Sequence, residues 1–224
     1  MGMKIKEVYL RKGIPAVSLT LGGLCVAVTA LSVLTSQSET FSFTYPVKYP
    51  WQLVTYVFQH HTPAEQLPPD YPASAMKLTI GHLTYNLLLL LPYGVLAEKV
   101  IGSKRLLLVS SVAWLVDTIT MYGFAIALSK NGEPFICKGG SGVAFCFVPL
   151  AASILFALGK KIGFGKLLKQ LSFYLLMPLI ITSVVIALNP FIAGTFSMVI
   201  HLIGIVCGAL FAFLFRKKIV DIIS

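Results

Sequence analysis

The stretch Gly139-Gly140-Ser141-Gly142 is the clearest candidate for chemistry, because it places a serine where a long apolar run begins. Glycines beside a serine let another part of the backbone approach it closely. The first amides of a helix lack partners within the helix and carry the positive end of its dipole. A serine hydroxyl beside such amides can attack a carbonyl group whose developing oxyanion they stabilise. For this short motif alone, a tight turn that merely opens a helix remains the alternative.

His201 is the candidate base for this serine. Gly204 and Gly208 follow it at positions i+3 and i+7, so the three residues share one face of a helix. Small residues on one face let two membrane helices pack closely. If the neighbouring helix is the one that begins at Ser141, the imidazole can take the hydroxyl proton and later return it to the leaving amine. The alternative is a structural histidine bonded to a backbone carbonyl.

His82 and Asn86 are candidate donors to an oxyanion. They stand four residues apart, on one face of a predicted helix. Both side chains can donate a hydrogen bond while they remain uncharged. The alternative is polar contact between helices, worth about 1 kcal/mol.

The composition predicts a membrane protein that positions these residues on helices. Of 224 residues, 57% are hydrophobic and 12% are charged, whereas soluble domains carry roughly 25% charged residues. A helix needs about 20 apolar residues to cross a bilayer, and the first span exceeds the apolar part of a signal peptide. We therefore expect an all-α polytopic bundle, with residues 1–224 as one domain. The predicted spans are residues 14–34, 78–97, 105–128, 141–158, 171–188 and 196–215.

The segment 35–77 between the first two spans is rich in proline and aromatic residues. Tryptophan and tyrosine favour the headgroup zone of a bilayer. We expect an interfacial loop here, with a short amphipathic helix at residues 51–58. Pro92 and Pro178 fall inside predicted spans, where we expect them to bend or weaken the helix.

The net charge of +10 follows membrane sidedness rather than a nucleic-acid surface. If the spans alternate, fourteen of the eighteen Lys and Arg residues fall on one side. Positive residues gather on the cytoplasmic side, so both termini are expected there. The motif at residues 139–142 then opens the fourth span at its outer end.

The remaining polar residues indicate no cofactor or metal. Of the four cysteines, only Cys137 is predicted in a loop, and none shows CxxC spacing. Asp117 lies in the middle of the third span, where a charged residue is a functional candidate. We expect it to accept a hydrogen bond from a neighbouring helix or a buried water.

These motifs together resemble the rhomboid intramembrane serine proteases, across essentially the whole six-span core. Residues 139–142 match the family GxSG motif, residues 201–208 match HxxGxxxG, and residues 82–86 match HxxxN. Gly94 to Glu98, followed by Gly102, is similar to the end of the family's second helix. The first loop is similar in Trp51, Thr55, Phe58 and His60.

The resemblance implies a role for each matching residue. Ser141 would be the nucleophile and His201 the general base of a dyad without an acid. The Ser141 amide, His82 and Asn86 would form the oxyanion hole. Phe145 occupies the position where the family often has a tyrosine stacked on the histidine.

Two departures from the family pattern concern the first loop. The family's Trp-Arg pair is Trp51-Gln52 here, and a proline-rich insertion at about residues 61–77 separates His60 from His82. We expect the arginine contact to be absent. Neither departure touches the dyad.

The resemblance implies an endopeptidase that cleaves in or beside the transmembrane segment of another protein, for which we expect single-span substrates. A prokaryotic plasma membrane, with the site opening to its outer side, is the expected location. We also expect the fifth span to form a lateral gate against the second.

Three alternatives stay open. A rhomboid-like pseudoprotease would bind membrane proteins without cleaving them. A small transporter could use the histidines and Asp117 as a proton relay, although no inverted repeat is visible. A metal site could use His60, His61 and His82, although no carboxylate or cysteine joins them at ligand spacing.

Overall fold

The structure is a computed structural model that describes residues 4–67, 74–129, 135–189 and 195–223. Part of the predicted insertion, residues 68–73, lies outside the described residues. Within the described residues, six helices are long and apolar enough to cross a membrane, so the prediction of an all-α membrane bundle is confirmed. They are α2 (Ala16–Thr35), α5 (Ala75–Ile101), α6 (Ser103–Leu128), α7 (Ser141–Ile162), α9 (Leu171–Leu188) and α11 (Thr195–Leu214).

Three of these helices are longer than predicted, α6 by two residues and α5 and α7 by more. Helix α5 begins at Ala75 because the Ser74 side chain accepts a hydrogen bond from the Lys77 amide, at 3.3 Å. Helix α7 continues past residue 158, since lysine is a good helix former, and it ends before Gly163, which has φ 86°. Hydropathy marks only the apolar part of such a helix, so the polar ends were missed.

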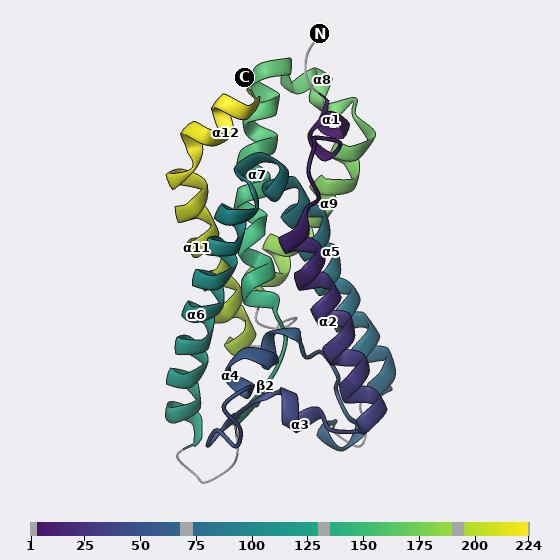
Figure 1. Cartoon of the computed structure of the whole chain (residues 1–224), viewed down its shortest axis with the longest axis vertical. Coiled ribbons are helices and arrows are strands. Elements are labelled where there is room, and N and C mark those ends of the chain that lie inside the picture. The colour runs from purple at the N-terminus through teal and green to yellow at the C-terminus, as the bar shows by residue number, and fades with distance from the viewer. Residues whose placement is uncertain (1–3, 68–73, 130–134, 190–194, 224) are drawn as a thin grey trace.

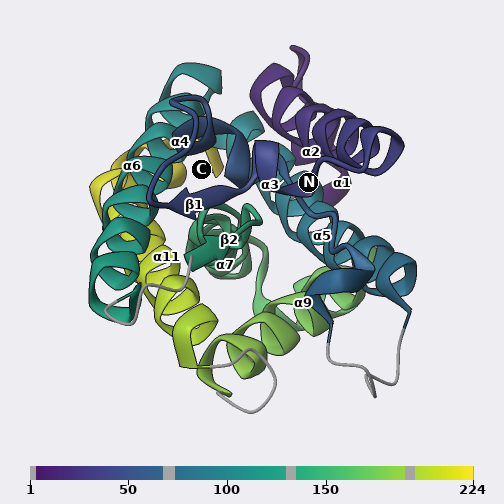
Figure 2. The same ribbon diagram turned by 90° about the horizontal axis from the view of Figure 1, so that it is seen from below.

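Helix α7 runs through the middle of the bundle, and the other five long helices surround it (Figures 1 and 2). In its most apolar window 72% of residues are buried, against 17–39% in the other spans. A membrane helix can be apolar on all sides and still face lipid, so it is the buried share, and not hydropathy, that distinguishes α7 from the other spans. The candidate serine therefore begins the most enclosed helix of the protein.

Helix α11 packs directly on α7 through its glycines. A Cβ atom on Gly204 would lie 2.3 Å from the Gly142 carbonyl oxygen, and one on Gly208 would lie 2.0 Å from that of Cys146. Only glycine permits such an approach. The contact brings His201, one turn before Gly204, to the start of α7.

The shorter elements lie at the two ends of the bundle (Figure 1). Helices α1 (Ile5–Tyr9), α8 (Phe164–Leu168) and α12 (Arg216–Ile223) lie at the end that holds both chain termini. The opposite end is covered by the first loop. Its elements are α3 (Ser38–Phe41), β1 (Phe43–Tyr45), α4 (Gln52–Thr55), η1 (Tyr56–Phe58) and η2 (Ala64–Gln66).

The two-stranded sheet at this end was not predicted. Strand β2 (Phe135–Cys137) pairs antiparallel with β1, with Phe43 opposite Cys137. The prediction that Cys137 lies in a loop was therefore wrong. The strands are three residues each and far apart in sequence, which leaves no alternating pattern to detect. Their pairing ties the first loop to the segment that leads into Ser141.

The predicted helix at residues 51–58 forms as α4 followed directly by the 3₁₀ turn η1. Pro92 and Pro178 lie inside α5 and α9, and both helices continue through them. The Pro92 carbonyl accepts a hydrogen bond from the Tyr9 hydroxyl, at 2.9 Å. Pro178 removes one helix hydrogen bond from α9.

Candidate active site

Ser141 and His201 are in contact. Ser141 is the first residue of α7, and its Oγ lies 3.0 Å from Nε2 of His201 on α11. His201 is only 7% exposed. The distance is that of a hydrogen bond, so the hydroxyl can donate its proton to the imidazole.

The turn before Ser141 is held by the first loop. Gly139 has φ 111°, which favours glycine, and its amide donates to the Tyr56 carbonyl oxygen at 2.8 Å. A Cβ atom on Gly140 would lie 2.5 Å from the Val57 carbonyl oxygen. The loop backbone thus fixes where the serine begins its helix.

His82 lies against the same turn. A Cβ atom on Gly139 would lie 2.7 Å from Cε1 and 2.9 Å from Nε2 of His82. The imidazole therefore occupies the space that a side chain at position 139 would need. His82 is brought beside the serine, as an oxyanion donor must be.

The candidate residues line one cavity of about 240 Å³. Ser141, His201, His82 and Asn86 are all on its wall. The volume exceeds what a water molecule needs. The other lining residues are Tyr85, Met121, Cys137, Lys138, Gly139, Ile186, Phe196, Ser197 and Ile200.

Asn86 is fully buried, and one of its N–H groups is already used. Its Nδ2 donates to the carbonyl oxygen of His82, one turn earlier, at 3.0 Å. The side chain lines the cavity and also interacts with His60, and an amide carries a second N–H group for a donor role.

The Phe145 ring stacks on His201, with ring centroids 4.2 Å apart and planes inclined by 22°. Phe145 is fully buried, and no described group binds the Nδ1 atom of His201. Among the described residues, no carboxylate orients the imidazole. Stacking and the glycine contacts of α11 hold it instead.

Asp117 does not join the dyad. Its carboxylate lies behind Gly142, where a Cβ atom would be 2.8 Å from Cγ, and its Oδ2 accepts from the Tyr56 hydroxyl at 3.2 Å. The expected partner was a neighbouring helix or a buried water, and the partner found is Tyr56 in the 3₁₀ helix η1. Tyr56 thus ties Asp117 on α6 to the first loop rather than to the dyad.

The two histidines of the first loop, His60 and His61, contact different parts of the protein. His60 packs edge-on against His82, with centroids 4.8 Å apart, while Nδ1 of His61 lies 3.2 Å from Ser32 Oγ on α2. Burial and the nearby His82 lower the pKa of His60 to about 3. His60 is therefore neutral at physiological pH and supports His82 by packing.

Gln52, which replaces the family's arginine, is the organising residue of the loop. It is fully buried, and its Oε1 accepts from the Thr44 hydroxyl at 2.8 Å and from the amides of Lys48 and Tyr49 at 3.0 and 3.1 Å. Its Nε2 donates to the Glu39 carbonyl at 2.8 Å. Sequence reasoning expected a lost contact here and missed this network, which has no local signature.

A comparison with known families agrees with this arrangement. Residues 74–218, well over half of the chain, match the family model of the Rhomboid domain. No curated protein matched the sequence. The matched region contains Ser141, His201, His82 and Asn86, and the six apolar helices make this an integral membrane protein. The chain belongs to the rhomboid family, whose members are generally intramembrane serine proteases.

Proposed function

We propose that this protein is an intramembrane serine endopeptidase that cleaves membrane-protein substrates in or beside a transmembrane segment. The observation that carries the proposal is the 3.0 Å contact between Ser141 Oγ and His201 Nε2 on the wall of a cavity. Membership of the rhomboid family supports it.

In this mechanism, Ser141 Oγ attacks the scissile carbonyl carbon while His201 Nε2 takes the hydroxyl proton. The amide of Ser141 has no partner within α7, and it donates to the oxyanion together with His82 and Asn86. His201 then gives its proton to the leaving amine as the C–N bond breaks. A water molecule, activated by the same imidazole, hydrolyses the acyl-enzyme and restores the serine.

Ser141 begins α7 at the end of that helix that points away from both chain termini (Figure 1). The lysine and arginine distribution favours cytoplasmic termini, and with that orientation the cavity would open on the outer side. The expected setting is a prokaryotic plasma membrane.

The substrate would have to unwind to react. A membrane helix hides its amides in its own hydrogen bonds, so small or helix-breaking residues are expected near the cut. Helix α9 is the candidate gate, since only 17% of its apolar window is buried and Pro178 interrupts its hydrogen bonds.

Co-expression with a panel of tagged single-span proteins tests the proposal. We expect at least one substrate to be cut by the wild type and left intact by Ser141→Ala. Ser153→Ala is the matched control, because among the described residues that hydroxyl bonds the Leu150 carbonyl of its own helix. Co-purification of a substrate without any cleavage would contradict the proposal and favour a pseudoprotease.

A further inference from the structure

A second cavity lies on the other side of the turn that carries Ser141. It has a volume of about 150 Å³ and is lined by residues of α2, α5, α6, α7 and the first loop. Gly140 lines this cavity, whereas Ser141 lines the one with His201. The two cavities are thus separated by the backbone of a single turn.

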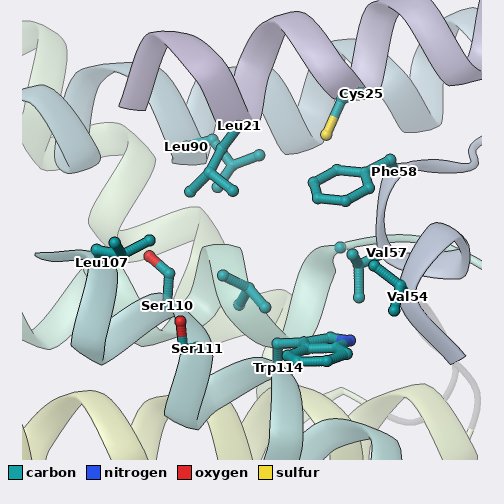
Figure 3. Close-up of a pocket in the computed structure, with 12 residues that line it drawn as sticks. Leu21, Cys25, Val54, Val57, Phe58, Leu90, Leu107, Ser110, Ser111 and Trp114 are labelled. Atoms are coloured by element: carbon teal, nitrogen blue, oxygen red, sulfur yellow. The ribbon is translucent and has the colours of Figure 1, made fainter. Parts of the chain in front are cut away.

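The walls of the second cavity are apolar. Figure 3 shows Leu21, Leu90 and Phe58 around it, with the Cys25 sulfur directed into it. Other lining residues are Val54, Val57, Leu107, Ser110, Ser111, Trp114 and Val143.

Two of the polar groups in the wall are already bonded. The Ser110 hydroxyl donates to the Leu106 carbonyl of its own helix at 2.9 Å, and the Trp114 N–H donates to the Leu53 carbonyl at 3.1 Å. A buried water needs two to four polar partners, and cavities that lack them stay dry. The occupant that fits is therefore a hydrocarbon.

The cavity is open on one side, where exposed apolar side chains form its rim. Its floor is buried, with Cys25 1% and Leu90 2% exposed, whereas its rim is open, with Leu107 55% and Val54 46% exposed. Leu107 and its exposed neighbour Leu108 belong to α6, a helix long and apolar enough to cross a membrane, so lipid would contact this rim. A substrate helix, about 10 Å wide, is too large for this space, and a cavity of about this volume admits a group the size of benzene.

We propose that this cavity binds one acyl chain of a bilayer lipid. The end of the chain would pack against Val57 and Gly140, the residues whose contact fixes the start of α7. The filled cavity restores the dispersion contacts that an empty one forfeits. The site is separate from the Ser141–His201 cavity, and the proposal does not depend on proteolysis.

Trp114 in the cavity wall provides the test. The chain has two tryptophans, so Trp51→Phe leaves Trp114 as the only one. The Trp51→Phe protein is reconstituted in phosphatidylcholine bilayers that contain a rising fraction of lipid with brominated acyl chains, which quench tryptophan fluorescence. We expect a saturable component of quenching at low brominated fraction, above the gradual quenching by bulk lipid.

Variants that fill the cavity with a larger side chain are compared with the Trp51→Phe parent. In the same background, Ser110→Leu from α6 and Cys25→Leu from α2 should each remove the saturable component. Thr120→Leu is the matched control, since Thr120 is on α6 outside the cavity and also bonds a carbonyl of its own helix. Two filling variants are used so that a folding defect in one does not decide the result. Unchanged quenching in a folded filled variant, or bulk quenching alone in the parent, would overturn the proposal.

Discussion

Helices α7 and α9 have similar mean hydropathy, 2.2 and 2.3, but very different surroundings. In α7, 72% of the apolar window is buried, and in α9 only 17%. Helix α7 is contacted at Gly140 by the first loop and at Gly142 by Asp117 and α11. Helix α9 exposes most of its large side chains, including Leu171, at 76%, and Leu175, at 65%.

This difference in burial suits the two helices to different roles, α7 to position the nucleophile and α9 to admit the substrate. A nucleophile must be held closely, and a buried helix contacted on every side can hold it. Loosely packed elements open at low cost, and α9 borders the cavity through Ile186. We therefore expect substitutions at the contacts of α7 to change the stability of the protein and the geometry of the site. We expect a restraint on α9 to change the access of substrate to the cavity.

The largest effect is expected where α11 meets α7. Gly208→Ala puts a methyl group 2.0 Å from the Cys146 carbonyl oxygen, so the helices must separate. We expect the free energy of unfolding in detergent to fall by about 3 kcal/mol. Gly81→Ala in α5 meets no atom within 4 Å and should be neutral or stabilising by up to about 1 kcal/mol. Equal stability of the two variants would contradict the packing account.

Restraining α9 should block cleavage while α7 stays intact. The side chains of Tyr85 on α5 and Ser183 on α9 are close enough to interact near the Ser141 end. A cross-link between Tyr85→Cys and Ser183→Cys, with the native cysteines replaced, should abolish proteolysis until it is reduced. A link between Tyr93→Cys and Leu176→Cys, where the Tyr93 hydroxyl already bonds the Leu176 carbonyl at 3.1 Å, should leave activity. Full proteolytic activity of the cross-linked Tyr85→Cys, Ser183→Cys protein would refute the proposal that α9 is a gate.

Gly139→Ala should impair chemistry more than folding. The new methyl group would displace His82, which lies 2.7 Å from its position, and a shift of about 1 Å can cost about 100-fold in rate. Gly13 has a similar φ of 96° but no atom within 4 Å of a new Cβ. Gly13→Ala therefore carries the same backbone strain without the contact. Comparable rates for the two variants, measured on one substrate, would show that His82 placement does not matter.

The smallest effect concerns pH. The pKa of buried His60 is lowered to about 3 from an ordinary value of 6.5, so between these values the unfolded chain binds more protons. Stability contributed by this group is therefore lost as pH falls below 6.5, by about 1.4 kcal/mol per pH unit. Thermal unfolding between pH 7 and 5 should show a shallower slope in His60→Gln. An unchanged slope would mean that His60 titrates normally in the folded protein.

The sequence predicted the parts of the fold that leave a continuous or periodic pattern of residues along the chain. Apolar runs marked the six spans, and the spacing of His201, Gly204 and Gly208 predicted a face that packs closely on another helix. The same patterns could not predict the pairing of β1 with β2 or the bond between Tyr56 and Asp117. These contacts join residues far apart in sequence through single side chains or three-residue strands, which leave no periodic trace.

The central claim is that Ser141 is made nucleophilic by His201, and a fluorophosphonate probe tests it directly. The account predicts covalent labelling of the membrane-embedded protein that is lost in Ser141→Ala and strongly slowed in His201→Ala, with Ser153→Ala labelled as the wild type. The account would be contradicted if Ser141→Ala were still labelled, or if His201→Ala were labelled as fast as the wild type.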